Sequence, residues 1–347
     1  MSTLAPRRSE PPRSEPPRTG PDRPDPYGPA RVVVRQHRWT LRATATLLAL
    51  VAAVTAVSRL LTDRFADRFA TTGCSVEHTV TGCGDTVRSY LDDQYLMHTL
   101  QSWAGLLVLV LPALVGAFTA GPLIARELET GTYRLAWSQS VSPARWLAAK
   151  LAVPAVPLLA GVSLVSAAST WARARTGSEY PLDWFDTPVY VATGTAPVAY
   201  ALAGLAVGAL TGLLVRRTVA ASSLAALATG ALIAAFGYFR SALRPPRTVV
   251  LSDSADGVSG GPPADSWVVH TGQLTSGGRR LPVDVCWLND VESQTRCVAD
   301  HDITGMFADY HPASHFWPLQ LVETGILLVL AALAVVLAFR VLRRRHG

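Results

Sequence analysis

Six long apolar stretches dominate the pattern of hydrophobic and polar positions along the chain. Within them, apolar residues do not alternate with polar ones as they do in half-buried strands or amphipathic surface helices. An α-helix needs about 20 mostly apolar residues to cross the hydrocarbon core of a bilayer, and each stretch is long enough. The predicted spans are residues 43–61, 103–124, 147–168, 189–215, 219–239 and 319–342.

The pattern predicts an all-α polytopic membrane protein with six transmembrane helices. A small extracytoplasmic insertion, α/β or irregular, is expected before the last helix. Residues 1–30 are rich in Pro, Arg, Ser and Glu, which predicts a disordered cytoplasmic tail. The expected membrane domain covers 31–240 and contains helices one to five and a cytoplasmic loop at 125–150. An extracytoplasmic loop domain at 241–318 is followed by the last helix and a basic tail at 319–347.

Several shorter elements are also expected. Residues 31–40 mix valines with arginines, which favours a helix lying on the membrane surface over a plain extension of the first span. Residues 87–101 are expected to be helical. In the insertion, the sequence predicts short β segments at 248–251, 266–270 and 283–288, and turn-rich breaks at 257–263 and 276–278.

Composition and charge agree with a membrane chain and suggest its orientation. Only 16% of the residues are charged, against about 25% in an ordinary soluble domain. Most Lys and Arg residues fall on the two terminal segments, the 125–150 loop and the Arg216–Arg217 turn. Because cytoplasmic loops carry the Lys and Arg excess, both termini are expected in the cytoplasm. The net charge of +6 then follows from topology and contact with membrane lipid, and no nucleic-acid partner is expected.

All four cysteines lie in loops that this orientation places outside. Disulfides persist in oxidising, extracytoplasmic space. Of the three possible connectivities, Cys74–Cys83 with Cys286–Cys297 is preferred, and four free thiols are the alternative. Neither pair has the close C-x-x-C spacing typical of a zinc site, so no metal is expected there.

The 125–150 loop carries the main functional motif. A short acidic and apolar helix, a glycine turn, a second helix and a Ser-Pro helix start form a segment suited to docking another protein. The loop resembles that of permease subunits of ABC transporters of the type-2 exporter class. Residues 310–320, followed by Glu323, resemble the start of the final span in actinobacterial permeases of this class. The loop residues expected to dock the partner are Glu127, Glu129, Gly131, Thr132, Arg134, Ser142, Pro143 and Arg145.

The resemblance implies a non-enzymatic permease subunit in a bacterial plasma membrane. An ABC ATP-binding subunit would drive export through the 125–150 loop, with ATP-Mg bound to that partner and no cofactor in this chain. A phosphate-binding P-loop ends in Gly-Lys-Ser/Thr, whereas the only lysine, Lys150, follows Ala149. A second permease copy or a homologue would complete the pathway. The alternative functions are an intramembrane enzyme and a membrane-anchored sensor that uses the 241–318 ectodomain.

Other candidate sites leave alternatives open. Gln320 and Glu323 lie near the outer end of the last span, where an ionisable group contacts cargo, gates a pathway or pairs with an outer-loop arginine. Glu127 and Glu129 dock the ATPase or form a solvated face. A loop boundary is favoured over a metal site for His311 and His315. A flexible loop is favoured over a nucleophile elbow for the G-x-S-x-G at 257–261.

The last of these motifs is the G-x-x-x-G pair Gly204 and Gly208, which allows two helices to approach closely. Packing within the chain is favoured over a dimer seam.

Overall fold

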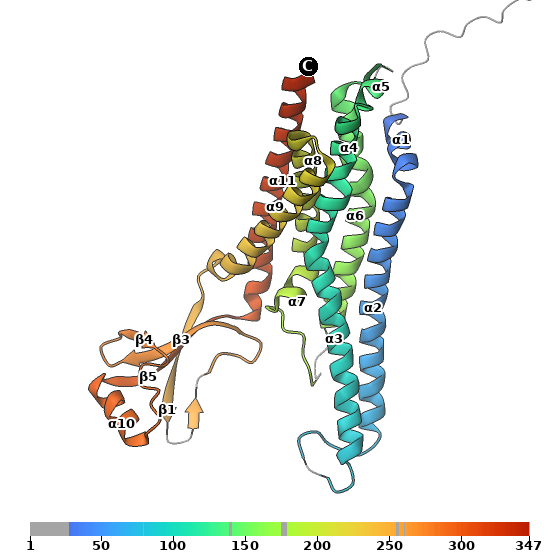
Figure 1. Ribbon diagram of the computed structural model, residues 1–347. Helices are drawn as coiled ribbons and strands as arrows, with labels where there is room; N and C mark the ends of the chain where they lie inside the picture. Colours follow the sequence, from blue (N-terminus) through green and yellow to red (C-terminus); the bar gives the residue numbers. More distant parts are fainter. Residues whose placement is uncertain are drawn as a thin grey trace, which may run out of the picture.

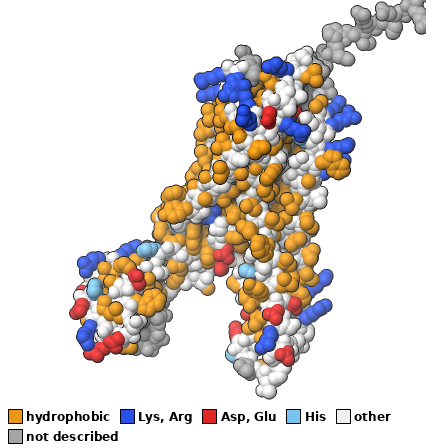
Figure 2. Space-filling model, in the orientation of Figure 1, with side chains coloured by type: hydrophobic (Ala, Val, Ile, Leu, Met, Phe, Trp, Pro, Cys, Tyr) orange, Lys and Arg blue, Asp and Glu red, His pale blue; other side chains and the backbone are white. Residues whose placement is uncertain are grey.

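The computed structural model describes residues 28–78, 80–138, 141–174, 179–254, 257–259 and 261–346. Residues 1–27 of the expected tail lie outside this part. Within it, six helical segments are long and apolar enough to cross a membrane, as predicted: Arg38–Ala70, Gly84–Thr130, Pro143–Arg173, Ala196–Val215, Thr218–Leu243 and Ala313–Arg345. Figure 2 shows hydrophobic side chains covering the middle of the helix bundle between two charged ends.

All the helices except α10, which lies beside the β-strands, form one elongated bundle (Figure 1). The helices are α1 (Gly28–Gln36), α2 (Arg38–Ala70), α3 (Gly84–Leu114), α4 (Gly121–Thr130), α5 (Tyr133–Ser138), α6 (Pro143–Arg173), α7 (Thr187–Ala192), α8 (Ala196–Val215), α9 (Thr218–Phe239), α10 (Val291–Asp300) and α11 (Phe316–His346). A π-helical turn, Val115–Ala120, joins α3 to α4. One end of the bundle, called the terminal end, contains α1, α5 and the C-terminus. The opposite end, called the sheet end, lies next to the β-strands.

Two predicted helices have different limits in the structure. Residues 31–40 contain the end of a separate short helix, α1, and the start of α2. The prediction of one helix over 189–215 is wrong, because the backbone breaks between α7 and α8. Gly194 adopts a left-handed φ of 70° there, and Pro197 lies in the first turn of α8, where its missing N–H is tolerated.

The first two long helices extend beyond a bilayer. With 33 residues in α2 and 31 in α3, their lengths are about 50 Å and 47 Å at 1.5 Å per residue. The hydrocarbon core is only about 30 Å thick. The region 87–101 is helical, as expected, and forms part of α3. A disulfide joins Cys74 to Cys83 at the tip of the α2–α3 hairpin, in the preferred pairing.

A five-stranded antiparallel sheet projects beside the sheet end of the bundle (Figure 1). Its strand order is β2-β1-β5-β3-β4. The strands are β1 (Arg247–Ser254), β2 (Gly257–Ser259), β3 (Trp267–Thr275), β4 (Arg280–Pro282) and β5 (Ile303–His311). The central pair, β1 and β5, leads directly from α9 and into α11, so the sheet is a continuation of the last two spans.

The insertion differs from its sequence-based description in three places. The prediction of a strand at 283–288 is wrong, since these residues form turns and irregular structure and β4 ends before them at Pro282. Residues 257–259 pair with β1 as β2 and do not form the expected loop; Gly260 of the G-x-S-x-G lies outside the described residues. The sequence also did not predict β5 or α10. The Cys286–Cys297 disulfide ties α10 to the preceding turns.

Helix α8 is the centre of the bundle, because its residues contribute to all three buried apolar clusters. Two glycines of α8 let the end of α3 and the π-helical turn pack closely against it. A Cβ atom on Gly204 would lie 2.2 Å from the carbonyl oxygen of Pro112, and one on Gly208 would lie 2.6 Å from that of Gly116. The G-x-x-x-G pair therefore packs within the chain, as favoured from the sequence.

Candidate functional site

The described part of the 125–150 region forms the end of α4, the short helix α5 and the start of α6 at the terminal end. Helix α4 ends at Gly131, whose left-handed φ of 74° is typical of a helix C-cap. Helix α6 begins after Ser142, whose hydroxyl accepts a 3.3 Å hydrogen bond from the Arg145 backbone N–H, and Pro143 occupies its first turn. The predicted order of elements in this loop is therefore present.

Glu127 links α4 to α6. Its Oε1 lies 2.5 Å from Lys150 Nζ, and its Oε2 accepts a 2.9 Å hydrogen bond from Trp146 Nε1. The Lys150 side chain is 2% exposed and that of Glu127 is 14% exposed. A buried ion pair with an added hydrogen bond is energetically coupled, because removing one charge leaves the other without compensation. Glu127 is thus largely buried and paired within the chain, and its contact with a partner stays a prediction.

Glu129 links α4 to α9. Its Oε2 accepts hydrogen bonds from both the backbone N–H of Thr218, at 2.9 Å, and the Thr218 hydroxyl, at 2.6 Å. Thr218 is the first residue of α9, so the carboxylate satisfies a backbone donor that the helix leaves unpaired and complements the positive end of its dipole. The two glutamates together attach the loop to two other spans.

Three of the other residues predicted to dock the partner face outward. Thr132, Arg134 and Arg145 are exposed, and Arg134 lies over the ring of Tyr133. The structure therefore brings the predicted docking residues to one end of the bundle but divides their roles. Glu127 and Glu129 hold the loop in place, and the threonine and two arginines present its surface.

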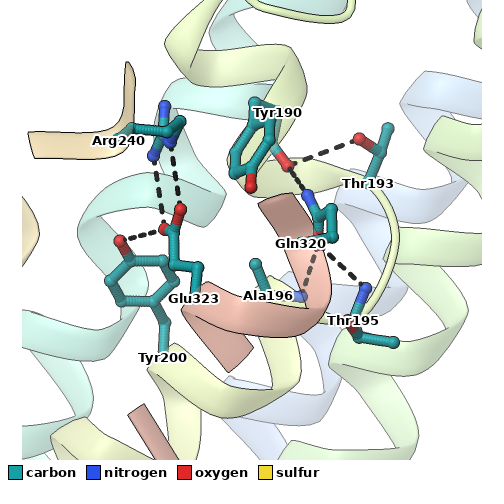
Figure 3. Close-up of polar contacts among 8 residues, drawn as sticks. All are labelled: Tyr190, Thr193, Thr195, Ala196, Tyr200, Arg240, Gln320 and Glu323. Atoms are coloured by element: carbon teal, nitrogen blue, oxygen red, sulfur yellow. Dashed lines mark hydrogen bonds and ion pairs between the residues drawn. The ribbon is translucent and has the colours of Figure 1, made fainter. Parts of the chain in front are cut away.

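A second cluster is buried near the sheet end (Figure 3). The guanidinium of Arg240 donates from Nε to Glu323 Oε2 at 3.1 Å and from Nη2 to Oε1 at 3.4 Å. The Tyr200 hydroxyl donates to the same Oε1 at 2.6 Å. Glu323 is fully buried, and the three side chains come from the end of α9, from α11 and from α8.

Gln320 bridges the break between α7 and α8, three residues before Glu323 on α11. Its Oε1 accepts hydrogen bonds from the backbone N–H groups of Thr195, at 3.2 Å, and Ala196, at 2.9 Å, while its Nε2 donates to the Tyr190 carbonyl at 2.9 Å. These are the backbone groups that a helix end leaves unpaired. Gln320 therefore stabilises the unwound segment inside the membrane domain.

Arg240 and Tyr200 were not identified from the sequence. Arg240 could have been identified, because it is the basic residue at the junction of an apolar span and an outer loop. An outer-loop arginine was one of the partners considered for Glu323. Tyr200 had none, because a single tyrosine within an apolar span is common. In this state Glu323 has no exposed surface, so contact with cargo would require the cluster to open. The cargo or gate role of Gln320 and Glu323 stays a prediction.

The two histidines considered for a metal contact each other instead. Their Nδ1 atoms are 3.0 Å apart, and His311 Nε2 is 3.1 Å from the Ser241 carbonyl oxygen. Burial lowers the pKa of His311. Within the described residues, the only group of three potential metal ligands is Cys286, Cys297 and His301, and its two cysteines form a disulfide.

Comparison with known proteins bears on the membrane domain. No curated protein and no solved structure matches the chain. The family described as ABC-2 membrane transporter related matches residues 45–240, which is more than half of the 347 residues. The matched region begins within the first span, contains the 125–150 loop and ends at Arg240 within the fifth span. The chain is therefore a permease that belongs to the ABC-2 membrane transporter related family.

Proposed function

We propose that this chain is the membrane-spanning subunit of an ATP-driven exporter, energised by a separate ATP-binding subunit through the 125–150 loop. ATP-Mg would be bound by that partner. The orientation is the one that the basic residues favour, with the terminal end in the cytoplasm of a bacterial cell. A second copy of the chain, or a homologue, would supply the other half of the pathway.

One observation carries this proposal: the loop is attached to separate spans at two points. Glu127 connects it to α6 through Lys150, and Glu129 connects it to the start of α9 through Thr218. A force applied to α4 and α5 would thus reach α6 and α9 through polar contacts. ATP binding to the partner would bias the bundle between two states through these contacts, as a ligand does when it binds one state better.

The intramembrane enzyme is not favoured. Both carboxylate oxygens of Glu323, the candidate acid inside the last span, are occupied by Arg240 and Tyr200. A general acid or base must reach the proton that it transfers, and Glu323 is fully buried.

The test is purification of the tagged, full-length chain from its native membrane, with identification of bound proteins by mass spectrometry. We expect a protein with a P-loop whose ATP hydrolysis changes on binding the permease. Reversing both outward-facing charges, with Arg134→Glu and Arg145→Glu, should lower its recovery at least tenfold. Arg64→Glu is the control, because Arg64 is exposed in the sheet-end half of α2. Equal recovery with all variants would contradict docking through this loop.

Orientation is tested separately in intact cells. The four native cysteines form two disulfides, so Thr132→Cys introduces a single reactive thiol. A membrane-impermeant maleimide should label it only after the membrane is permeabilised. Labelling of intact cells would place the loop outside and would exclude a cytoplasmic motor.

A further inference from the structure

A basic cleft opens at the terminal end of the bundle, between α5, the α8–α9 turn and the end of α11. Its volume is about 890 Å³, and it is lined by Tyr133, Arg134, Trp137, Leu214, Arg216 and Arg345. The three arginines come from three elements that are far apart in the sequence. Lys and Arg side chains gather at this end of the molecule (Figure 2).

The positive charge of the cleft is not neutralised by the part of the chain that the structure describes. No described acid forms an ion pair with any of the three arginines. Among the described residues, two of them donate to neutral acceptors: Arg345 Nη1 to the Leu213 carbonyl at 2.9 Å, and Arg134 Nε to the Tyr133 hydroxyl at 3.4 Å. These bonds orient the guanidinium groups without reducing their charge, so the cleft is suited to an anion.

The backbone at Arg216 supports a specific role for its side chain. Arg216 caps α8 with a left-handed φ of 56°. Glycine is the usual residue at such a position, because a side chain makes this conformation costly. An arginine there places a guanidinium at the cleft at the expense of the more favourable turn residue, and strained positions of this kind are concentrated at binding sites.

The cleft lies at the end of the α8 span, where a membrane surface is expected. Leu214 is 45% exposed and belongs to the last turn of the α8 span, which ends at Val215. Trp137 and Tyr133 provide the aromatic rings that concentrate at membrane–water boundaries. Three cations beside an exposed leucine at the end of a span match an amphipathic anion, with its charged group at the arginines and its tails along α8.

We propose that this cleft binds the phosphate group of an anionic phospholipid from the leaflet at the terminal end. The planar guanidinium group offers paired donors to phosphate oxygens, which makes arginine well suited to this group. Basic pockets between transmembrane helices bind lipid head groups in this way. The position of exposed Leu214 in the last turn of a membrane span favours a lipid over the ATP-binding subunit as the occupant.

The experiment uses the purified full-length chain, with any bound partner, in detergent. It is exchanged with mixed micelles of phosphatidylglycerol and phosphatidylcholine that carry the same acyl chains. Lipid retained after size-exclusion chromatography is counted by mass spectrometry. We expect phosphatidylglycerol to be enriched. Arg216→Gln and Arg345→Gln should each lower its affinity about fivefold, since a basic residue near anionic lipid contributes about 1 kcal/mol.

Arg343→Gln is the matched control, because Arg343 is exposed two residues earlier on α11 and does not line the cleft. Equal loss with Arg343→Gln, or no preference for phosphatidylglycerol, would overturn the proposal. Inorganic phosphate that displaces the lipid at equal concentration would show an anion site without lipid recognition, and would also overturn it. If the two cleft substitutions release the ATP-binding subunit and leave lipid retention unchanged, the cleft is a protein site. Failure of the proposed function is distinguished by Arg145→Glu alone, because Arg145 does not line the cleft whereas Arg134 belongs to both surfaces.

Discussion

Arg240 and Glu323 form a buried ion pair, with 3.1 Å between Nε and Oε2, that joins the end of α9 to α11 across 83 positions of sequence. The chain between them forms the sheet, whose central strands β1 and β5 continue these two helices. The pair therefore closes the base of the sheet, so that α9, α11 and the sheet are expected to move together.

The first prediction concerns this pair. Glu323→Gln should destabilise the protein by about 3–5 kcal/mol, because removing one partner leaves a buried charge without compensation. Thermal unfolding of the purified protein in detergent measures the change. The double variant Arg240→Met with Glu323→Leu should recover much of the loss, since it leaves no charge unpaired. Equal stability of the single variant and the native protein would show that the pair is not coupled.

The second prediction separates the two loop glutamates. Glu127→Gln should leave Lys150 buried with its charge uncompensated, and should increase hydrogen exchange across α4, α5 and the start of α6. Glu129→Gln should affect only the first turn of α9, because the amide oxygen can still accept from Thr218 but no longer brings a negative charge to the start of the helix. Hydrogen-exchange mass spectrometry distinguishes these results. Equal exchange in the two variants would show that Glu127 has no special role in holding the loop.

The third prediction tests the close approach of α8. Gly208→Ala would place a Cβ atom 2.6 Å from the Gly116 carbonyl oxygen and 2.8 Å from the Cβ of Ala120. Such overpacking typically costs about 1–3 kcal/mol, and it should lower the unfolding midpoint. Gly230→Ala on α9 is the control, because a Cβ atom there meets nothing within 4 Å. A smaller effect at Gly208 than at Gly230 would contradict the packing described here.

The fourth prediction concerns the α8–α9 turn. Arg216→Gly should stabilise the protein by about 1 kcal/mol, because glycine adopts the left-handed conformation without steric cost. The same variant should retain less phosphatidylglycerol, as Arg216→Gln does. Stability and lipid binding are therefore expected to change in opposite directions, as measured by thermal unfolding in lipid-free detergent and by lipid counting. Destabilisation by glycine would show that the arginine is needed for folding itself.

The fifth prediction is a pH dependence of the sheet. The Ser241 carbonyl oxygen can only accept a hydrogen bond, so neutral His311 carries its proton on Nε2. Its Nδ1 then accepts a hydrogen bond from Nδ1 of His315. Burial lowers the pKa of His311 from its usual 6.5. Its contribution to stability is thus complete above about pH 6.5 and is lost as the pH falls from there towards the folded-state pKa. His311→Gln should reduce the drop in unfolding midpoint between pH 7.5 and 5.5.

Exposed His270 provides the control for that experiment, and His270→Gln should leave the drop unchanged. An unchanged drop in His311→Gln would instead assign the pH dependence to other groups.

Much of the membrane domain was predictable from single stretches of sequence. Spans are recognisable because lipid requires about 20 apolar residues in each, whatever the rest of the chain does. The break between α7 and α8 is the exception. The 189–215 run is apolar throughout, yet the helix breaks at Gly194, because Gln320 from a distant span satisfies the freed backbone groups. A local pattern does not contain that partner.

In the 125–150 loop, too, local patterns predicted the helix ends but not the partners that come from distant segments. Gly131, Ser142 and Pro143 end or begin helices by local rules, and their positions were read correctly. The partner of Glu127 was not predicted, because Lys150 lies 23 residues away and their pairing depends on how α4 packs against α6. Likewise β5 pairs with β1 and β3 across long connections, and its own residues carry only a weak alternating pattern.

The sequence by itself determined the number of spans, the segments between them and the cysteines available for disulfides, because membrane insertion and helix ends depend on residues that are neighbours in the chain. Only the tertiary structure decided which charges are buried and paired, where a span unwinds and which arginines meet in one cleft. These outcomes depend on contacts between distant segments, and in a low-dielectric interior a charge is stable only where such a partner is present.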